Sequence, residues 1–213
     1  MQIAIDGPAS TGKSTVAKII AKKLDFLYVD TGAMYRSLTY FGLKNKIDLN
    51  NEELLTNLLK SMNYDSRVIN NRLHFFVNSE DVTQEIRNPI VAKNVSQVAS
   101  YPSVRKHLIS LQQNIAGNQN VVMDGRDIGT VVLPSADYKF FLTADPKIRA
   151  KRRFLENKKK GINLSLEELV TAIKRRDELD SKQMVMAKDA ILIDTGEMSI
   201  DQVVNSLMNK IQR

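Results

Sequence analysis

The residues that most clearly indicate chemistry are Gly7-Pro8-Ala9-Ser10-Thr11-Gly12-Lys13-Ser14, near the start of the chain. A glycine, four residues of any type and then Gly-Lys-Ser form the pattern of a loop that wraps around phosphate oxygens. The glycines let backbone N–H groups approach the phosphates, and Lys13 can bridge the β- and γ-phosphates. The hydroxyl of Ser14 can ligate Mg²⁺, and Thr15 can add a phosphate contact. The sequence therefore predicts a site for a nucleoside triphosphate with magnesium.

The loop lies between a predicted strand and a predicted helix, which is the context that the pattern requires. Residues 2–6 form the strand, and the residues after Lys13 place Val16, Ile20 and Leu24 on one side of the helix. Because the helix begins at the loop, its positive dipole end points at the same anion. A chance match in a strand–turn–helix unit is the plainer alternative, and both parts of the context speak against it.

Short apolar segments recur along the chain and alternate with helical stretches. Continuously apolar strands of this length are typical of a parallel sheet with helices on both faces. We therefore predict a single α/β core whose five parallel strands lie near residues 2–6, 26–29, 120–124, 138–142 and 190–194. Residues 62–83 break the alternation and predict a small antiparallel sheet, with strands at 64–69 and 73–77 and a turn at Asn70-Asn71.

A second segment that favours anion binding is Asp30-Thr31-Gly32-Ala33-Met34-Tyr35-Arg36, which also follows a strand and opens a helix. An arginine one turn into that helix can hold a phosphate through two N–H donors. Two such sites at the carboxyl ends of neighbouring strands predict a donor and an acceptor nucleotide that face each other. Asp124 ends another strand and is a candidate to hold magnesium indirectly or to act as a base. Its plainer interpretation is a turn aspartate before Gly125.

Three segments together identify a family: the phosphate loop, residues 30–36, and Asp124-Gly125-Arg126-Asp127-Ile128-Gly129-Thr130-Val131-Val132. The likeness extends over nearly the whole chain through Ser96-Gln97-Val98-Ala99 with Arg105, and through Arg176-Asp177-Glu178-Leu179-Asp180. In these segments the chain resembles the bacterial cytidylate (CMP/dCMP) kinases, which are P-loop nucleoside monophosphate kinases. The resemblance implies the P-loop fold, an enlarged monophosphate-binding subdomain inserted at residues 58–98, and a mobile lid at residues 149–162.

The resemblance also implies an activity, the transfer of the γ-phosphoryl group of ATP, with Mg²⁺, to CMP or dCMP. The implied substrate-binding residues are Thr31, Tyr35, Arg36, Ser96, Arg105, Arg126, Asp127, Arg176 and Asp180. The implied catalytic residues are Lys13, Arg126, Arg176, Asp124, Arg152 and Arg153. Among these, Asp127 is chemically suited to select cytosine, because an aspartate accepts from the exocyclic amine that uracil lacks.

Several of these residues also have plainer interpretations. Asp127 can pair with a nearby arginine, Ser96 can be an ordinary serine on a helix surface, and Lys151-Arg152-Arg153 can be a solvated cluster. One position departs from the family pattern. Gln183 stands where a phosphate-binding arginine is expected, so either Lys182 substitutes with a point charge or the site has one cation fewer.

The net charge of +7 is confined to one region. Residues 139–188 contain fourteen Lys or Arg and seven Asp or Glu, so the rest of the chain sums to zero. Such a segment predicts a polyanionic partner, although a solvated surface explains charge alone equally well. The open alternatives to a cytidylate kinase are a kinase for UMP or AMP and a P-loop ATPase that binds nucleic acid. Aromatic residues are not interleaved with the charges, which disfavours nucleic acid.

The composition excludes some classes of protein. The chain has no cysteine, so it has neither disulfides nor a cysteine-based metal site. It shows no signal peptide and no long apolar run, so we expect a cytoplasmic protein that does not bind a membrane. From the family likeness we expect a monomer whose partners are the nucleotides ATP, CMP and dCMP.

Overall fold

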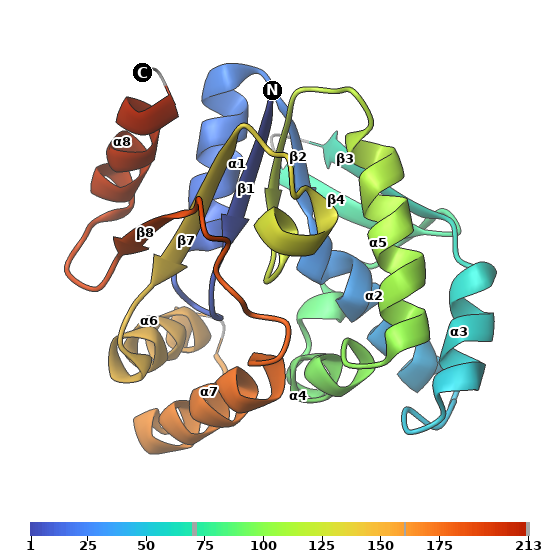
Figure 1. Ribbon diagram of the computed structural model, residues 1–213. Helices are drawn as coiled ribbons and strands as arrows, with labels where there is room; N and C mark the ends of the chain where they lie inside the picture. Colours follow the sequence, from blue (N-terminus) through green and yellow to red (C-terminus); the bar gives the residue numbers. More distant parts are fainter. Residues whose placement is uncertain (70–71, 160, 212–213) are drawn as a thin grey trace. The chain divides into compact units, whose positions relative to one another are not determined.

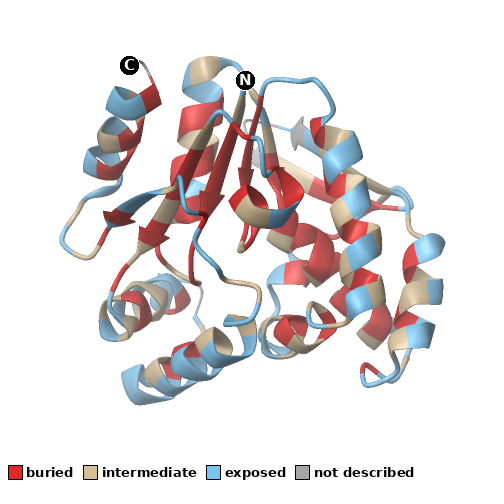
Figure 2. Cartoon of the chain, viewed as in Figure 1, coloured by how far each residue is buried: buried red, intermediate tan, exposed pale blue. Residues whose placement is uncertain are grey.

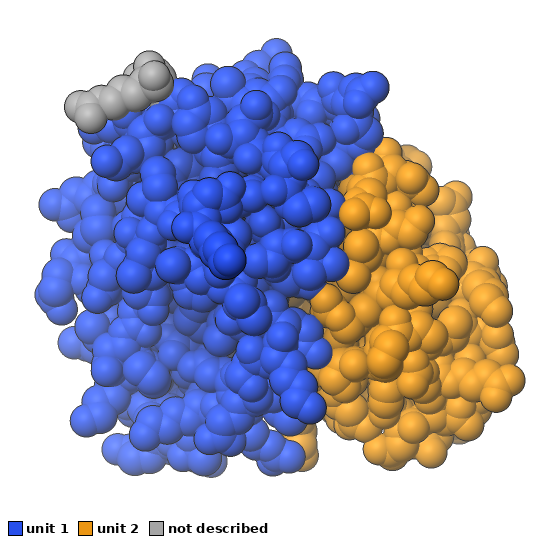
Figure 3. Space-filling model, in the orientation of Figure 1, with its two compact units in different colours: residues 1–30, 115–213 blue, residues 31–114 orange. Residues whose placement is uncertain are grey.

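The computed structural model describes residues 1–69, 72–159 and 161–211. The chain forms two compact units, which Figure 3 distinguishes by colour. The first unit comprises Met1–Asp30 and Ile115–Arg213, and the second comprises Thr31–Asn114. Each unit has its own sheet and its own buried core.

The sheet of the first unit has five parallel strands in the spatial order β2-β6-β1-β7-β8. The strands are β1 (Gln2–Asp6), β2 (Leu27–Asp30), β6 (Val121–Asp124), β7 (Tyr138–Thr143) and β8 (Ile191–Asp194). Central β1 pairs with both β6 and β7, so the phosphate loop that follows it emerges in the middle of the sheet (Figure 1). This confirms the five-stranded parallel sheet, and each strand begins within one residue of its predicted start.

Among the described residues, four α-helices belong wholly to the first unit: α1 (Lys13–Leu24), α6 (Pro146–Lys159), α7 (Leu166–Asp180) and α8 (Ile200–Ile211). Side chains of α1 and α8, including Val16 and Leu207, pack with Ile5 and Phe140 of the sheet in one core. Figure 2 shows the result, since the central strands are buried along almost their whole length. This core gives the phosphate loop a rigid base at both of its ends.

Helices α6 and α7 form an antiparallel pair beside the sheet (Figure 1). Ala150, Leu169 and Ile173 make the buried contact between them. The start of α7 is fixed by a capping box, in which Ser165 accepts from the backbone N–H of Glu168 and the Glu168 carboxylate accepts from that of Ser165. The segment expected to act as a lid therefore consists mostly of helix α6 and the start of its connection to α7.

The second unit contains α2 (Thr31–Lys44), α3 (Glu52–Lys60), α4 (Pro89–Val98) and most of α5 (Pro102–Ala116), with a 3₁₀ turn at Glu85–Arg87. Its antiparallel sheet is β3 (Tyr64–Ile69), β4 (Arg72–Val77) and β5 (Glu80–Asp81), in that order. The predicted small sheet is thus confirmed, with β5 as an additional short strand. The predicted turn at Asn70-Asn71 lies outside the described residues.

Within the described residues, no helix combines the length and the apolar character that crossing a membrane requires.

Candidate active site

The phosphate loop lies where the sequence places it, between the end of β1 and the start of α1. Gly7 has φ 135°, and a Cβ at this position would stand 2.0 Å from the carbonyl oxygen of Leu142. The backbone of β7 therefore passes so close that only glycine fits. Gly12 caps α1 with φ 93°, again a conformation that favours glycine. Both glycines of the motif are required by the backbone path itself.

Lys13 is buried, and its ammonium group is held by the loop that precedes it. Its Nζ donates to the carbonyl oxygen of Pro8 at 2.6 Å, and the hydroxyl of Thr11 donates to the same oxygen at 3.2 Å. Burial, followed by the nearby Arg126 cation, lowers the pKa of Lys13 to about 7. An anion in the loop would favour the charged form of this lysine. A phosphate bound in the loop would therefore raise the pKa of Lys13.

Asp124 joins β6 to the start of α1. One carboxylate oxygen accepts from the Ser14 hydroxyl at 2.8 Å, and the other accepts from the Tyr28 hydroxyl at 2.6 Å. Burial, followed by the neighbouring Asp30 carboxylate, raises the pKa of Asp124. The structure thus brings together the two residues that the sequence assigned to magnesium, Ser14 and Asp124. These oxygens fit a hard cation such as Mg²⁺, which is held by few protein groups and completes its shell with water and phosphate oxygens.

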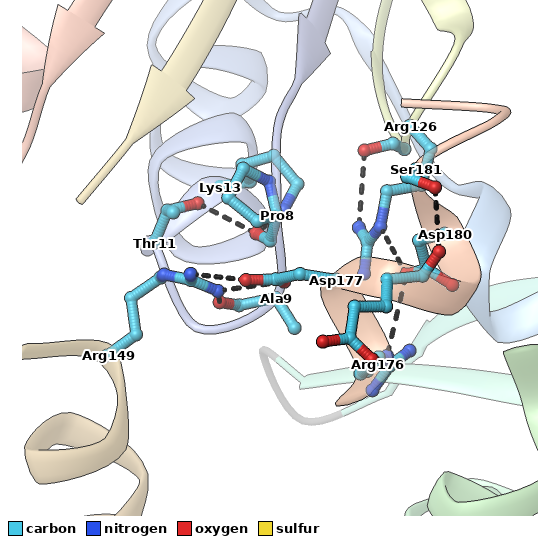
Figure 4. Close-up of polar contacts among 12 residues, drawn as sticks. Pro8, Ala9, Thr11, Lys13, Arg126, Arg149, Arg176, Asp177, Asp180 and Ser181 are labelled. Atoms are coloured by element: carbon cyan, nitrogen blue, oxygen red, sulfur yellow. Dashed lines mark hydrogen bonds and ion pairs between the residues drawn. The ribbon is translucent and has the colours of Figure 1, made fainter. Parts of the chain in front are cut away.

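A second cluster lies at the carboxyl end of α7, where Figure 4 shows three charged side chains meeting. Arg126 Nε donates to the Asp180 carboxylate at 2.9 Å, and Nε of Arg176 lies 3.7 Å from the same oxygen. Arg126 follows β6, whereas Arg176 and Asp180 lie one turn apart on α7. The structure therefore brings together three of the residues that the sequence assigned to the acceptor nucleotide.

The segment after Arg126 is shaped by a buried carboxylate that the sequence analysis did not single out. Both oxygens of Asp6 accept backbone N–H groups at 2.8 Å, one from Ile128 and one from Gly129. These residues open a π-helical turn, Ile128–Val132, whose backbone bonds run back by five residues. Asp127, the residue assigned to cytosine, immediately precedes the turn and is buried. Asp6 therefore fixes the backbone beside the candidate base-reading residue.

The arginines of α6 differ in their surroundings. Arg152 donates to the Thr195 hydroxyl at 3.0 Å, to the carbonyl oxygen of Gly196 at 3.2 Å and to the carbonyl oxygen of Thr195. Arg153 is half-buried and lies 3.5 Å from a Glu156 carboxylate oxygen. The assigned roles of Arg152 and Arg153 as catalytic charges remain predictions, and Arg152 is in this structure tied to the loop after β8.

The other residues assigned to the acceptor belong to the second unit. Thr31, Tyr35 and Arg36 lie on the first turns of α2, Thr31 and Tyr35 buried and Arg36 half-buried. Ser96 is buried on α4, and its hydroxyl has no hydrogen-bond partner among the described residues. Arg105 is half-buried on α5. A buried hydroxyl without a partner costs free energy, which favours a ligand as its partner.

Comparison with known proteins decides between the alternatives. The sequence model of the cytidylate kinase family matches residues 3–213. The chain belongs to the cytidylate kinase family. It is 52% identical to cytidylate kinase of Ligilactobacillus salivarius (strain UCC118), over 100% of this chain and 96% of that one. It is 51% identical to cytidylate kinase of Oceanobacillus iheyensis (strain DSM 14371 / CIP 107618 / JCM 11309 / KCTC 3954 / HTE831), over 98% and 93% of the two chains.

Solved structures confirm the fold of this cytidylate kinase family member. Shikimate kinase from Bacteroides thetaiotaomicron matches it with a TM-score of 0.54 at 16% identity, over 100% of this chain and 99% of that one. An uncharacterised protein from Eubacterium ventriosum ATCC 27560 matches with a TM-score of 0.52 at 13% identity, over 100% and 98%. At these identities the likeness concerns the fold alone.

The structure adds residues of this kinase that the sequence analysis missed. Tyr28 and Asp6 are polar groups at or near strand ends. Tyr28 donates to Asp124, and Asp6 accepts from the backbone beside Asp127. Asp6 immediately precedes the phosphate loop, and Tyr28 lies on the strand next to Asp124. These positions could have identified both residues. Gln183 lies in the turn after α7, where its backbone N–H donates to the carbonyl oxygen of Asp180 at 3.0 Å. The position that lacks the expected arginine therefore lies next to Asp180 and its partner Arg126.

Proposed function

We propose that this kinase transfers the γ-phosphoryl group of ATP to the 5′-phosphate of CMP or dCMP by in-line displacement. The observation that carries the proposal is the cytidylate kinase family match over residues 3–213, which includes all the residues of the candidate site. The local geometry supports it, because the phosphate loop and the Arg126–Asp180 cluster both belong to the unit with the parallel sheet.

We assign the donor nucleotide to the phosphate loop. Backbone N–H groups of Gly7 and of residues 9–15, together with the ammonium group of Lys13, hold its phosphates. Ser14, with Asp124 behind it, would hold Mg²⁺, which supplies positive charge to the phosphate oxygens when bound. The partly buried hydrogen bond from Ser14 to Asp124 orients the hydroxyl for that role.

We assign the acceptor phosphate to Arg36, Arg126 and Arg176, since guanidinium groups bind phosphates through paired donors. Asp180 binds the sugar. When the acceptor binds, the Asp180 carboxylate exchanges its contacts with Arg126 and Arg176 for contacts with the sugar hydroxyls. We assign cytosine to Asp127, Ser96 and Arg105, and Thr31 and Tyr35 to the surroundings of the acceptor. The unpartnered hydroxyl of Ser96 supports this assignment.

Catalysis in such a reaction is positioning together with neutralisation of spreading negative charge. Lys13, Arg126 and Arg176 provide cations from the phosphate loop, the end of β6 and α7. Arg152 and Arg153 add to them when residues 149–162 close as a lid over the donor, and closure excludes water as a competing acceptor. The positive charge of residues 139–188 would thus help to neutralise the negative charge of the nucleotides.

Product analysis tests this function directly. The kinase is incubated with ATP, Mg²⁺ and CMP, and nucleotides are separated after partial reaction. We expect CDP and ADP in equal amounts and little ADP without CMP. ADP that forms only when nucleic acid is added, without CDP, would instead establish a nucleic-acid-stimulated ATPase. The cytoplasmic location, the monomeric state and the absence of a nucleic-acid partner remain predictions.

A further inference from the structure

Arg149, on the second turn of α6, is an arginine with only 2% of its surface exposed. A guanidinium buried to this degree is costly unless acceptors surround it. Its Nε donates to the carbonyl oxygen of Ala144 at 2.9 Å, and a terminal nitrogen donates to that of Ala9 at 3.2 Å. The two terminal nitrogens also bind the two carboxylate oxygens of Asp177 at 3.0 and 2.5 Å (Figure 4). One side chain thus makes four hydrogen bonds to three residues.

These three acceptors come from different parts of the first unit. Ala9 belongs to the phosphate loop, Ala144 follows β7, and Asp177 lies on α7. The resemblance to the family places Arg149 at the first position of the expected lid, residues 149–162. The structure directs its donors at protein acceptors, two of which are backbone carbonyls that cannot move without moving the loop or the sheet.

The bond to Ala9 constrains the phosphate loop. In a trans peptide the carbonyl group of one residue and the N–H group of the next point in opposite directions. No cis peptide occurs among the described residues. By holding the carbonyl group of Ala9, Arg149 also sets the direction of the N–H group of Ser10. Backbone N–H groups of this loop are the donors that hold phosphate oxygens.

The bond to Asp177 constrains helix α7. A bidentate arginine–carboxylate pair fixes orientation as well as distance. Arg176 immediately precedes Asp177, and Asp180 follows it by three residues and binds Arg126 at 2.9 Å. The rotation of α7 that satisfies Arg149 is therefore the rotation that presents Arg176 and Asp180 beside Arg126.

We propose that Arg149 is a positioning residue for phosphoryl transfer, which fixes Arg176 on α7 relative to the Ala9–Ser10 peptide of the phosphate loop by way of Asp177. Arg149 itself touches neither nucleotide. This inference rests on the proposed function, because Arg176 and the loop must act on the same transferred group for their spacing to matter.

The test compares Arg149→Lys, Asp177→Asn and the double variant. Lysine keeps the charge and loses the bidentate pair, and asparagine keeps the shape and loses the carboxylate. Lys151→Met on α6 and Glu178→Gln on α7 are matched controls, since both residues are exposed and have no assigned role. Turnover and KM for ATP and CMP are measured below the unfolding temperature of each variant, which is recorded separately.

We expect each single variant to lose about a hundredfold in kcat, the effect of misplacing a catalytic group by about 1 Å. The double variant should lose no more than either single variant, because both remove the same link. Asp177→Asn at full activity, with Arg149→Lys impaired only in KM for ATP, would overturn the proposal and make Arg149 a direct ligand of the donor. If Arg149→Lys does not fold, the shape-conserving Asp177→Asn decides alone. An absence of CDP with the unchanged kinase would refute the proposed function instead.

Discussion

The Nζ of Lys13 lies 2.6 Å from the carbonyl oxygen of Pro8, so the buried ammonium group is held inside the loop that is proposed to hold the donor phosphates. Removing it takes away a positive charge where negative charge develops. We expect Lys13→Ala to lose at least about a thousandfold in kcat, as with other charged or dipolar stabilisers of a transition state. The measurement is the steady-state rate of ADP release with CMP. Near-normal turnover would remove the phosphate loop from the mechanism.

Asp127 is buried at the start of the π-helical turn, and its proposed partner is the exocyclic amine of cytosine. Asp127→Ala should reduce the ratio of kcat/KM for CMP to that for UMP by roughly tenfold or more, since a good base-specific hydrogen bond contributes about 1–3 kcal/mol of discrimination. The dissociation constant for Mg-ATP, measured by calorimetry, should change little. An unchanged CMP-to-UMP ratio would contradict the base-reading assignment.

The segment after α7 raises a separate question, whether Lys182 replaces the cation that Gln183 does not supply. If it does, Lys182→Met should raise KM for CMP several-fold and leave KM for ATP unchanged, because an exposed point charge contributes about 1 kcal/mol. Ser181→Ala is the neighbouring control, since Ser181 is exposed and its hydroxyl donates to the carbonyl oxygen of Glu178 within the same helical turn. A KM for CMP that does not change would show that the site operates with one cation fewer.

Asp6 predicts a pH dependence of stability. Burial raises its pKa from 3.8 to about 6, against the lowering effect of the Gly129 and Ile128 N–H groups. A raised pKa in the folded state means that the stabilisation by the bound proton is complete below about pH 4 and is lost as the pH rises through about 6. Between pH 4 and 7 the free energy of unfolding of the kinase should therefore fall by roughly 2 kcal/mol relative to that of the non-titrating variant Asp6→Asn.

Urea denaturation of both proteins at several pH values measures this difference. Groups that do not interact with Asp6 titrate alike in the two proteins, so the subtraction isolates Asp6 together with its electrostatic coupling to Lys13. A difference in the free energy of unfolding that stays constant from pH 4 to 7 would show that Asp6 has an ordinary pKa.

The sheet could be predicted because its strands are short, continuously apolar and separated by helical periods. Strand β5 could not, since Glu80-Asp81 carries no apolar pattern and pairs only because β4 offers it an edge. The π-helical turn also escaped prediction, because its bonds depend on the distant carboxylate of Asp6 rather than on local sequence.

The phosphate loop and the Ser14–Asp124 pair were predictable from motifs that place Ser14 at the start of the helix after β1 and Asp124 at the end of β6. The surroundings of the arginines were not. Sequence shows where a charge lies along the chain, but the direction of a long side chain is decided by which acceptors the fold leaves beside it. Arg149 and Arg153 are close neighbours on one helix, yet one is buried against Asp177 and the other lies beside Glu156.

The most direct test of the account is a comparison of acceptors. The rate of ADP release is measured with saturating Mg-ATP and increasing CMP, dCMP, UMP or AMP, and kcat/KM is obtained for each acceptor. We expect CMP and dCMP to be the two best acceptors, each with a kcat/KM well above that of UMP and AMP. A higher kcat/KM for UMP or AMP than for CMP would contradict it.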